Sequence, residues 1–412
     1  MADREIDFLI VGGGVAAASC AETLREEGAE GSIAVVGREP DPPYHRPPLS
    51  KGYLRGEEGR EDALLHPDGW WKEQEIELLI RTSVMKLDPG ERTARLSTKE
   101  EVRFGHALLA MGANVRRLRV DGSDLAGIHY LRAFGNSDGI RADADAAERV
   151  VVIGGSYIAC EVAATLAARG TRCTMVMQED VTLERAFGAD IGRFFQSVLE
   201  EHGVDLLGGD ELERLEGDGE RVGKVVTAGG RELDADCVVI GAGVMPDVML
   251  ARSAKLELGG SGGIACSSGL ETSAEGIFAA GDVAEYDSPL LGRPVRIEHW
   301  DVAREHGRTA ARNMLGGDVA HEAVPYFWSD LADWASFEYV SVGGPPPGEP
   351  VLRGSLEDGA FSAFWLAEDG PLAAALVVAR PGELEEARRM IAERSSADRE
   401  ALADAGAGLA SV

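Results

Sequence analysis

"FLIVGGGVAAASCAETLREEG", residues 8–28, joins an apolar run to three glycines and then to a segment of small residues that ends at glycine. This order predicts a buried strand, a tight turn and a helix. Gly12, Gly14 and Ala17 give the spacing GxGxxA. In a dinucleotide-binding unit the first position permits the turn, the second lets the backbone approach a pyrophosphate, and the third packs the helix on the strand. The helix N-terminus then offers N–H groups and a positive dipole to the phosphates.

A second copy of the pattern, "VVVIGGSYIACEVAATLAARG", stands at residues 150–170. Gly154, Ser156 and Ala159 occupy the corresponding positions, and serine is small enough to keep the backbone approach open. One such turn is a weak signal, because glycine turns also join strands to helices for structural reasons alone. Two copies with strand and helix in the same order indicate two dinucleotide-binding units.

Two carboxylates are candidates for contacts with the first dinucleotide. "SIAVVGREP", residues 32–40, ends its strand at Arg38 and Glu39, and we expect Glu39 to bind the adenosine ribose and Arg38 to lie over the adenine. "GIFAAGDVAEY", residues 276–286, places Asp282 at the end of another strand, where it can accept hydrogen bonds from ribityl hydroxyls. The alternative for Asp282 is a helix-capping aspartate.

The ribose contact of the second unit is less well defined. In "TMVMQED", residues 174–180, Met177 or Gln178 falls where the acid belongs, and Glu179 comes slightly late. No arginine pair follows this strand closely enough to clamp a 2′-phosphate, and Arg185 would need an unusual loop to reach it. The sequence therefore favours NAD(H) as the second nucleotide, with NADP(H) not excluded.

The composition limits the cellular compartment and the classes of binding partner that we expect for the chain. The net charge of −30 argues against nucleic acid and against an anionic membrane. No apolar run approaches the roughly 20 residues of a membrane helix, and the first strand begins too early to leave room for a signal peptide, so we expect a cytoplasmic protein. The five cysteines form no CxxC pair and no metal-binding spacing, which predicts small apolar residues and no metal: Cys20, Cys160, Cys173, Cys237 and Cys266.

Together these motifs resemble the FAD-dependent pyridine nucleotide reductases, in the branch of ferredoxin reductases and apoptosis-inducing factor. The resemblance covers nearly the whole chain. Beyond the two glycine turns it rests on "PYHRPPLSKGYL" (43–54), "LLAMGANVRR" (108–117), "VVIGAGVMPD" (238–247), "FAAGDVAEY" (278–286), "RIEHWDVAREHGRTAARNMLG" (296–316) and "PYFWSDLADWASFEYV" (325–340).

The resemblance implies an α/β fold with two Rossmann-like domains and a C-terminal α+β domain. An FAD domain would comprise residues 1–112 and 240–320, with an NAD(P) domain, 113–239, inserted into it. The C-terminal domain would comprise residues 321–412, and its tail from residue 403 is expected to be loose. Four strands are expected in that domain: "FEYVSVGG" (337–344), "PVLRGS" (350–355), "AFSAFWLA" (360–367) and "LAAALVVA" (372–379).

The resemblance also assigns roles to single residues. Lys51 of "RPPLSK" would lie near flavin N5 and pair with Glu161, while Trp300 and Trp328 would flank the isoalloxazine. The alternatives are a surface salt bridge for Lys51 and core packing for the tryptophans. Ser50 is a candidate cap for a helix that starts at Lys51. Further cofactor contacts carried over from the family are Arg46, Val84, Ala110, Gly112, Arg116, Tyr157, Ile158 and Gly243.

The lack of a redox cysteine pair determines where electrons can go. Without it, electrons from a nicotinamide hydride must leave directly from the isoalloxazine, which fits a one-electron carrier. The resulting hypothesis is an NAD(P)H oxidoreductase that reduces a ferredoxin-type iron–sulfur protein serving an oxygenase. The alternatives are an apoptosis-inducing-factor-like protein that switches partners or dimerisation on reduction by NADH, and a non-catalytic flavin-binding module.

The charge also bears on the acceptor, because ferredoxins are usually acidic and two acidic proteins repel each other. Arginine clusters at residues 115–119 and 385–390 are candidates for a local basic patch, and solvated faces explain them equally well. A monomer and a homodimer are both compatible with the sequence.

Overall fold

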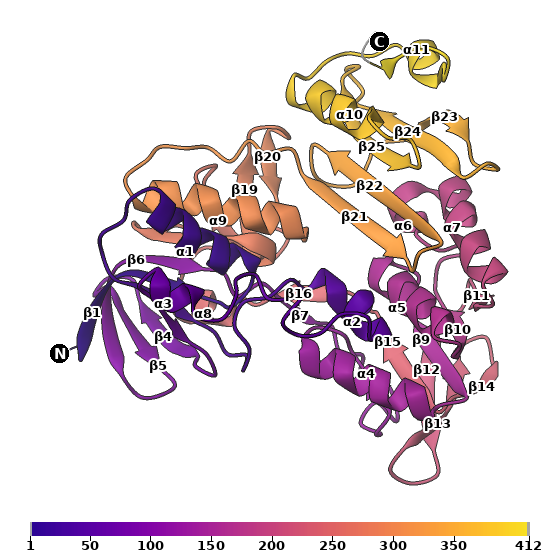
Figure 1. The fold of residues 1–412 in the computed structure, drawn as a ribbon, viewed down its shortest axis with the longest axis horizontal. Helices are drawn as coiled ribbons and strands as arrows, with labels where there is room; N and C mark the ends of the chain where they lie inside the picture. The colour runs from indigo at the N-terminus through magenta and orange to yellow at the C-terminus, as the bar shows by residue number, and fades with distance from the viewer. Residues whose placement is uncertain (1, 410–412) are drawn as a thin grey trace.

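The computed structural model describes residues 2–409, and its first large sheet combines the N-terminal segment with one strand from a distant part of the chain (Figure 1). This sheet has seven strands in the order β3-β2-β1-β6-β5-β4, with β18 beside β6. The bounds are β1 Arg4–Val11, β2 Ile33–Val36, β3 Ile76–Leu79, β4 Val84–Asp88, β5 Thr93–Leu96, β6 Glu101–Leu109 and β18 Ile277–Ala279. Because β18 pairs in parallel with β6, segments about 170 residues apart complete one sheet, as the discontinuous first unit requires.

Two helices cover this sheet side by side, α1 Val15–Glu26 and α9 Trp300–Met314. Their close approach depends on Gly307, where an added Cβ would lie only 2.3 Å from the carbonyl oxygen of Ala16. Gly281 meets the same two helices, since its Cβ would contact Ala16 and Ala303. The N-termini of the two helices therefore lie together, which brings Trp300 to the end of the sheet that carries the first glycine turn.

The second large sheet is parallel, in the order β11-β10-β9-β15-β8. Its strands are β8 Ile128–His129, β9 Arg149–Ile153, β10 Arg172–Val176, β11 Asp205–Leu207 and β15 Cys237–Ile240. The associated helices are α4 Phe134–Ala146, α5 Tyr157–Ala168, α6 Glu184–Phe187 and α7 Ala189–Glu201, and a small antiparallel sheet follows with β12 Leu212–Gly217, β13 Val222–Thr227 and β14 Glu232–Asp234. The α/β fold with two Rossmann-like units is confirmed.

A two-stranded ribbon marks where the chain passes between these sheets. β7, Ala113–Val115, carries the chain out of the first sheet, and β16, Val244–Pro246, pairs with it antiparallel on the way back. The domain boundaries at 112/113, 239/240 and 320/321 stay predictions. The remaining elements of the first unit are η1 Pro47–Ser50, α2 Gly52–Arg55, α3 Trp70–Glu73, α8 Met249–Ser253, η2 Gly281–Val283, β17 Ile264–Cys266, β19 Ala284–Ser288 and β20 Arg293–Val295.

The C-terminal sheet is antiparallel and has five strands, one more than the sequence indicated. Its order is β21-β22-β25-β24-β23, with bounds β21 Tyr326–Leu331, β22 Ala335–Ser341, β23 Val351–Ser355, β24 Ala360–Leu366 and β25 Leu372–Val378. The additional strand, β21, contains the "FWSD" residues and forms a tight hairpin with β22. Helices α10, Glu383–Ala392, and α11, Arg399–Ala403, complete this part of the chain.

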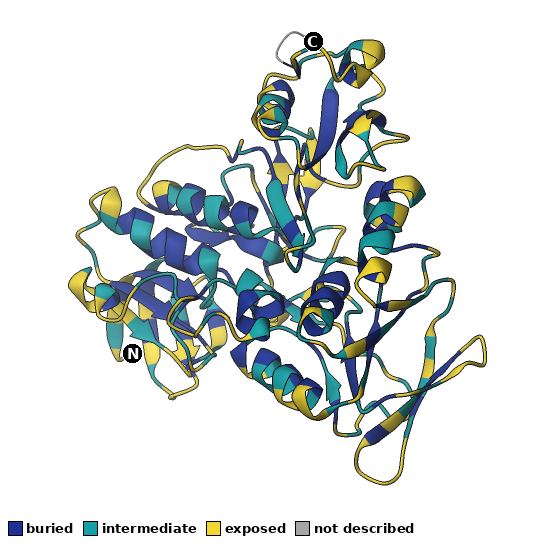
Figure 2. Cartoon of the chain, turned by 45° about the vertical axis from the view of Figure 1, so that its right-hand side comes forward, coloured by how far each residue is buried: buried dark blue, intermediate teal, exposed yellow. Residues whose placement is uncertain are grey.

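A shared aromatic core fixes the C-terminal sheet on the second unit. Phe187 and Phe195 of that unit lie 5.3 and 5.0 Å from the ring of Phe337 on β22. Phe361 and Trp365 of β24 belong to the same buried cluster. In Figure 2 the buried stretches of the neighbouring strands and helices are dark blue. This packing holds β21 against α5, where it reaches the site described below.

The prediction of a loose tail from residue 403 onward is wrong for the part that the structure describes. Arg353, only 2% exposed, donates hydrogen bonds to carbonyl oxygens of the tail segment, those of Leu402, Asp404 and Ala407. Leu402 and Leu409 are buried in the hydrophobic core between the C-terminal sheet and α10. Sequence reasoning missed this because the anchor is a single buried arginine on a distant strand. Residues 410–412 lie outside the described part.

The prediction that the cysteines are buried side chains without a disulfide is confirmed, since all five are free and buried. Burial raises the pKa of Cys173 and of Cys237 to about 12, so neither is a ready thiolate. Among residues 2–409 no group of metal-ligating side chains is gathered, and no helix there is both long and apolar enough to cross a bilayer.

Arg353→Met should release the tail segment. The change leaves one buried and two partly buried carbonyl oxygens without their donor and removes one partner of Glu383, 2.8 Å from the guanidinium. We expect the free energy of unfolding to fall by about 3–5 kcal/mol and amide exchange to accelerate across residues 402–409. Arg394→Met, which removes a solvent-exposed ion pair, should cost less than about 1 kcal/mol. Wild-type exchange rates in the Arg353 variant would contradict this account of the tail.

Candidate functional site

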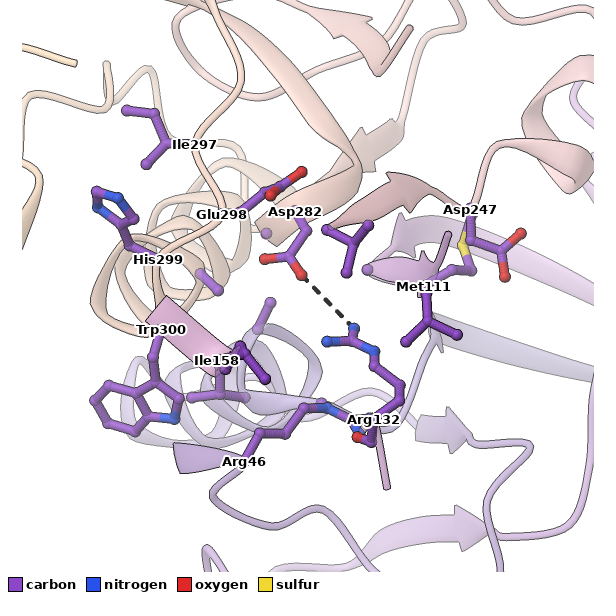
Figure 3. Close-up of a pocket in the computed structure, with 18 of the residues that line it drawn as sticks. Arg46, Met111, Arg132, Ile158, Asp247, Asp282, Ile297, Glu298, His299 and Trp300 are labelled. Atoms are coloured by element: carbon purple, nitrogen blue, oxygen red, sulfur yellow. Dashed lines mark hydrogen bonds and ion pairs between the residues drawn. The ribbon is translucent and has the colours of Figure 1, made fainter. Parts of the chain in front are cut away.

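A cavity of about 980 Å³ gathers most of the predicted site residues (Figure 3). It lies between the glycine turn after β1, the segment around η1, the start of α5, η2, the start of α9 and β21. The predicted residues that line it are Gly12, Gly14, Arg38, Glu39, Arg46, Lys51, Val84, Ala110, Gly112, Ser156, Tyr157, Ile158, Glu161, Gly243, Asp282, Trp300 and Trp328. The predicted residues that do not line it are Ala17, Arg116, Gly154, Gln178 and Glu179.

The first glycine turn has the geometry that a bound pyrophosphate needs. Gly12 adopts a φ of +136°, and a Cβ there would lie 2.1 Å from the carbonyl oxygen of Ala110, so only glycine fits. A Cβ on Gly14 would meet no atom within 4 Å, which leaves open space in front of the N-terminus of α1. Gly154 repeats the first constraint, with a φ of +120° and its Cβ 2.5 Å from the carbonyl oxygen of Gly241. The residues present therefore fit a dinucleotide at this turn.

Glu39 is held by two partners at the cavity wall. Arg46 Nη2 lies 2.5 Å from its Oε1, and the Tyr44 hydroxyl donates to its Oε2 at 2.5 Å. Burial alone would raise the pKa of Glu39, but the charge and hydrogen bonds of these partners lower it below its ordinary value. Arg38 instead reaches the connecting ribbon, where it bonds Asp247 at 2.9 Å. The adenine contact predicted for Arg38 stays a prediction.

Arg132 is a site residue that sequence reasoning missed. Its guanidinium lies 3.6 Å from Asp282 across the cavity, and Figure 3 shows the two side chains pointing toward each other. Its carbonyl oxygen accepts a hydrogen bond from Arg46 at 2.5 Å. Burial, and then the neighbouring Arg46 cation, lower the pKa of Arg132 below its usual range. Two such cations beside one cavity suit an anionic diphosphate. No motif marks this arginine, because it follows β8 in the unit assigned to the second nucleotide.

The predicted pairing of Lys51 with Glu161 is present in the structure. Lys51 Nζ contacts Glu161 Oε1, and the side chains are only 14% and 6% exposed, so the pair is not a surface salt bridge. Glu161 also accepts hydrogen bonds from Ser50 Oγ at 2.5 Å and from Ser329 Oγ at 2.6 Å. Ser50 is therefore not the helix cap that the sequence suggested. Lys51 itself precedes α2, and no side chain caps that helix.

Aromatic side chains form another part of the cavity wall. The rings of Trp300 and Trp328 lie 6.0 Å apart and nearly perpendicular. Trp300 Nε1 and His299 Nδ1 are buried, and neither has a hydrogen-bond partner within the described residues. Burial lowers the pKa of His299 to about 4, so the imidazole is neutral at pH 7. The wall thus combines aromatic rings with unused polar atoms, which suits a planar ring with hydrogen-bonding edges.

At the second glycine turn, Arg185 lies closer than the sequence indicated. The segment of residues 177–183 joins β10 to α6 and places Arg185 Nε 2.5 Å from Glu179 Oε1 and Nη2 3.2 Å from Gln178 Oε1. The expected lack of a clamp for a 2′-phosphate stays a prediction. Its guanidinium is largely exposed and lines the cavity beside Ser156 and Tyr157.

Comparison with known proteins identifies the family. Residues 6–307 match the pyridine nucleotide-disulphide oxidoreductase family, and residues 326–412 match the reductase C-terminal family. The chain belongs to these families, whose members use FAD and a pyridine nucleotide. The family name refers to a disulphide, but no cysteine lines the cavity in the described part of this chain.

Individual relatives are similar along their whole length. The chain is 35% identical over 404 residues, 98% of each protein, to the ferredoxin–NAD(+) reductase component of an anthranilate 1,2-dioxygenase system from Burkholderia cepacia. A ferredoxin reductase of the CYP199A2 system from Rhodopseudomonas palustris has a similar structure, with a TM-score of 0.93, 31% identity and 98% of each chain covered. The covalent putidaredoxin reductase–putidaredoxin complex matches with a TM-score of 0.93 and 32% identity over 99% of this chain and 98% of that one.

Asp282→Ala should weaken FAD binding without unfolding the chain. The change removes a carboxylate from the cavity wall and leaves Arg132 without its ion-pair partner. A charge-assisted hydrogen bond contributes about 1.5–3 kcal/mol, so we expect the Kd for FAD to rise roughly 10- to 100-fold in fluorescence titrations of the apoprotein. Asp287→Ala, an exposed carboxylate on β19, is the matched control. An unchanged Kd in the Asp282 variant would remove this residue from the site.

Proposed function

We propose that the chain is an FAD-dependent NAD(P)H oxidoreductase that passes electrons through the flavin to a ferredoxin-type acceptor. The proposal rests on one cavity, which residues of both glycine turns border. Within the described part of the chain, no cysteine lines this cavity. A hydride donor and a flavin can meet there, and no disulfide intervenes before the electrons leave. When bound, FAD supplies the chemistry that accepts a hydride and releases electrons singly.

The chain's own residues bind and orient the two nucleotides. The diphosphate of FAD would lie at Gly14 and the N-terminus of α1, with Arg46, Arg132 and Asp282 along the same cavity. Lys51 would place a cation beside the reactive ring, held there by Glu161. This assignment is supported by the open space at Gly14 and by the burial of the ion pair. The FAD domain would be formed by residues 1–112 and 240–320.

The second nucleotide would bind at the N-terminus of α5, near Ser156, Tyr157 and Ile158, within the domain at 113–239. Glu179 favours NADH because a carboxylate accepts hydrogen bonds from a ribose 2′-hydroxyl and repels a 2′-phosphate. Arg185 partly offsets that repulsion, so the preference should be modest. A cytoplasmic location is part of the proposal, and five free cysteines support it.

A basic patch beside the aromatic wall offers a landing site for an acidic acceptor. We define it as Arg304 and Arg308 of α9 and Arg388 of α10. Arg304 lies over the ring of Trp300 at 5.3 Å, and Arg388 lies over the ring of Tyr326 at 5.9 Å. Asp301 and Glu305 pair with these three arginines, which leaves a local excess of one positive charge next to Trp300. Such an excess can attract an acidic ferredoxin although the net charge of the chain is −30. The relatives named as reductase components favour this reading over partner switching.

Anaerobic stopped-flow measurements test the function in two half-reactions. NADH should bleach the flavin absorbance, and oxidised putidaredoxin, used as a probe acceptor, should restore it. Arg388→Glu should lower kcat/KM for the acceptor about tenfold or more, about 1.4 kcal/mol, while leaving reduction by NADH unchanged. Arg389→Glu, on the same helix but paired with Glu386 and Glu393, is the control. A flavin that neither NADH nor NADPH reduces would contradict the proposal, and a more than tenfold preference for NADPH would contradict the preference for NADH.

A further inference from the structure

The buried ion pair has a third charged neighbour, Asp330. Asp330 Oδ2 lies 3.9 Å from Lys51 Nζ, and its side chain is 32% exposed. Asp330 follows Ser329, which donates a hydrogen bond to Glu161 at 2.6 Å, so β21 contributes consecutive residues to the two ends of the pair. The mechanism outlined above has no use for this carboxylate.

Asp330 also borders a second cavity, of about 900 Å³, which neither Lys51 nor Glu161 lines. This cavity lies between α7, the turn after β21 and the turn that joins β23 to β24. Figure 1 shows α7 beside the sheet that contains β21. Lys51 and Glu161 line the first cavity, and Asp330 lines the second. The two cavities therefore approach each other where Lys51 Nζ and Asp330 Oδ2 lie 3.9 Å apart.

Turnover of the proposed reaction leaves one proton to be removed. NADH and two oxidised one-electron acceptors yield NAD⁺, two reduced acceptors and one proton. The two acceptors would take up only the electrons of the hydride, so one proton must leave the site at each turnover. A nucleotide bound in the first cavity displaces water on that side, so the proton needs another exit.

We propose that Asp330 accepts this proton from Lys51 and releases it to water in the second cavity. The inference rests on the proposed function. The Lys51 ammonium gives one proton to the Asp330 carboxylate as its nitrogen takes the proton from the reoxidised ring, so Lys51 ends each turnover as it began. Asp330 then loses the proton to solvent. The 3.9 Å separation exceeds a hydrogen bond, so a small rotation or one bridging water completes the step.

The surroundings of Asp330 suit transient protonation. Burial is the largest cause that raises the pKa of Asp330 above its ordinary value, and the Glu161 carboxylate raises this pKa further. The Lys51 and Arg55 cations and a hydrogen bond with Trp328 act in the opposite direction. A carboxyl with a raised pKa exchanges protons more readily near neutral pH. The charged groups that border the second cavity are Asp190, Arg193 and Glu201 on α7, Asp333 after β21, and Glu357 and Asp358 in the β23–β24 turn.

The first test is reoxidation of the NADH-reduced holoenzyme by ferricyanide, a one-electron probe that needs no protein partner. Asp330→Asn should slow reoxidation at pH 7 about tenfold or more, flatten its dependence on pH and enlarge the effect of D₂O on the rate. Asp330→Glu keeps a carboxylate and should restore most of the rate. Asp333→Asn, which changes an exposed carboxylate of the same cavity, should behave as wild type.

The second test needs no turnover. Infrared difference spectra between the oxidised and reduced holoenzyme should contain a carboxyl band that shifts in D₂O. The band should persist in Asp333→Asn, vanish in Asp330→Asn and move in Asp330→Glu. Should the asparagine variant not load FAD, the glutamate variant decides, because an unmoved band there would overturn the proposal.

Reoxidation of Asp330→Asn at the wild-type rate, with the wild-type isotope effect, would also overturn the proposal. Hydride transfer requires no proton from solvent, so NADH should still reduce the flavin in this variant. Failure of both NADH and NADPH to reduce the wild-type flavin would contradict the proposed function instead, and the two failures are thereby distinguished.

Discussion

The site depends on one buried carboxylate, that of Glu161. It accepts hydrogen bonds from Ser50 and Ser329 and contacts the Lys51 ammonium, so two distant parts of the chain converge on α5 at this residue. A buried ion is tolerated only when its partners replace the lost water, and removal of one partner is costly. The convergence therefore fixes the segment around η1, the start of α5 and β21 relative to one another. That arrangement forms the wall in which Lys51 meets the cavity.

Charge is distributed so that an acidic chain can hold an anionic cofactor. The net charge of −30 is spread over the surface, whereas Arg46, Arg132 and the N-terminus of α1 converge on the cavity. Beside Trp300, the basic patch of Arg304, Arg308 and Arg388 would meet a similar requirement, the attraction of an acidic partner. Local arrangement of charges, rather than the total, governs both kinds of recognition.

Short sequence motifs predicted the parts of the site where local backbone geometry admits only one type of residue. Gly12 and Gly154 were readable because a left-handed turn against a carbonyl admits only glycine, and the pairing of Lys51 with Glu161 followed from a family resemblance. Arg132, Asp330 and the tail anchor Arg353 were not readable. Each acts through contacts with segments far away in the sequence, set by how the sheets pack, and periodicity carries no information about such contacts. Ser50 was misread for the same reason: its partner lies 111 residues away.

The central claim is that Lys51, held by Glu161, sets the electrostatics at the flavin. The most direct measurement is the midpoint potential of the bound flavin in Lys51→Met, with Lys86→Met, whose side chain is 70% exposed, as the control. A unit charge pair about 4 Å apart is worth about 4 kcal/mol at an effective dielectric of about 20, before compensation by solvent. The account predicts a clearly less positive potential in Lys51→Met, a shift in the opposite direction in Glu161→Gln, and no change in Lys86→Met. Equal potentials in wild type and Lys51→Met would place this lysine away from the flavin and contradict the account.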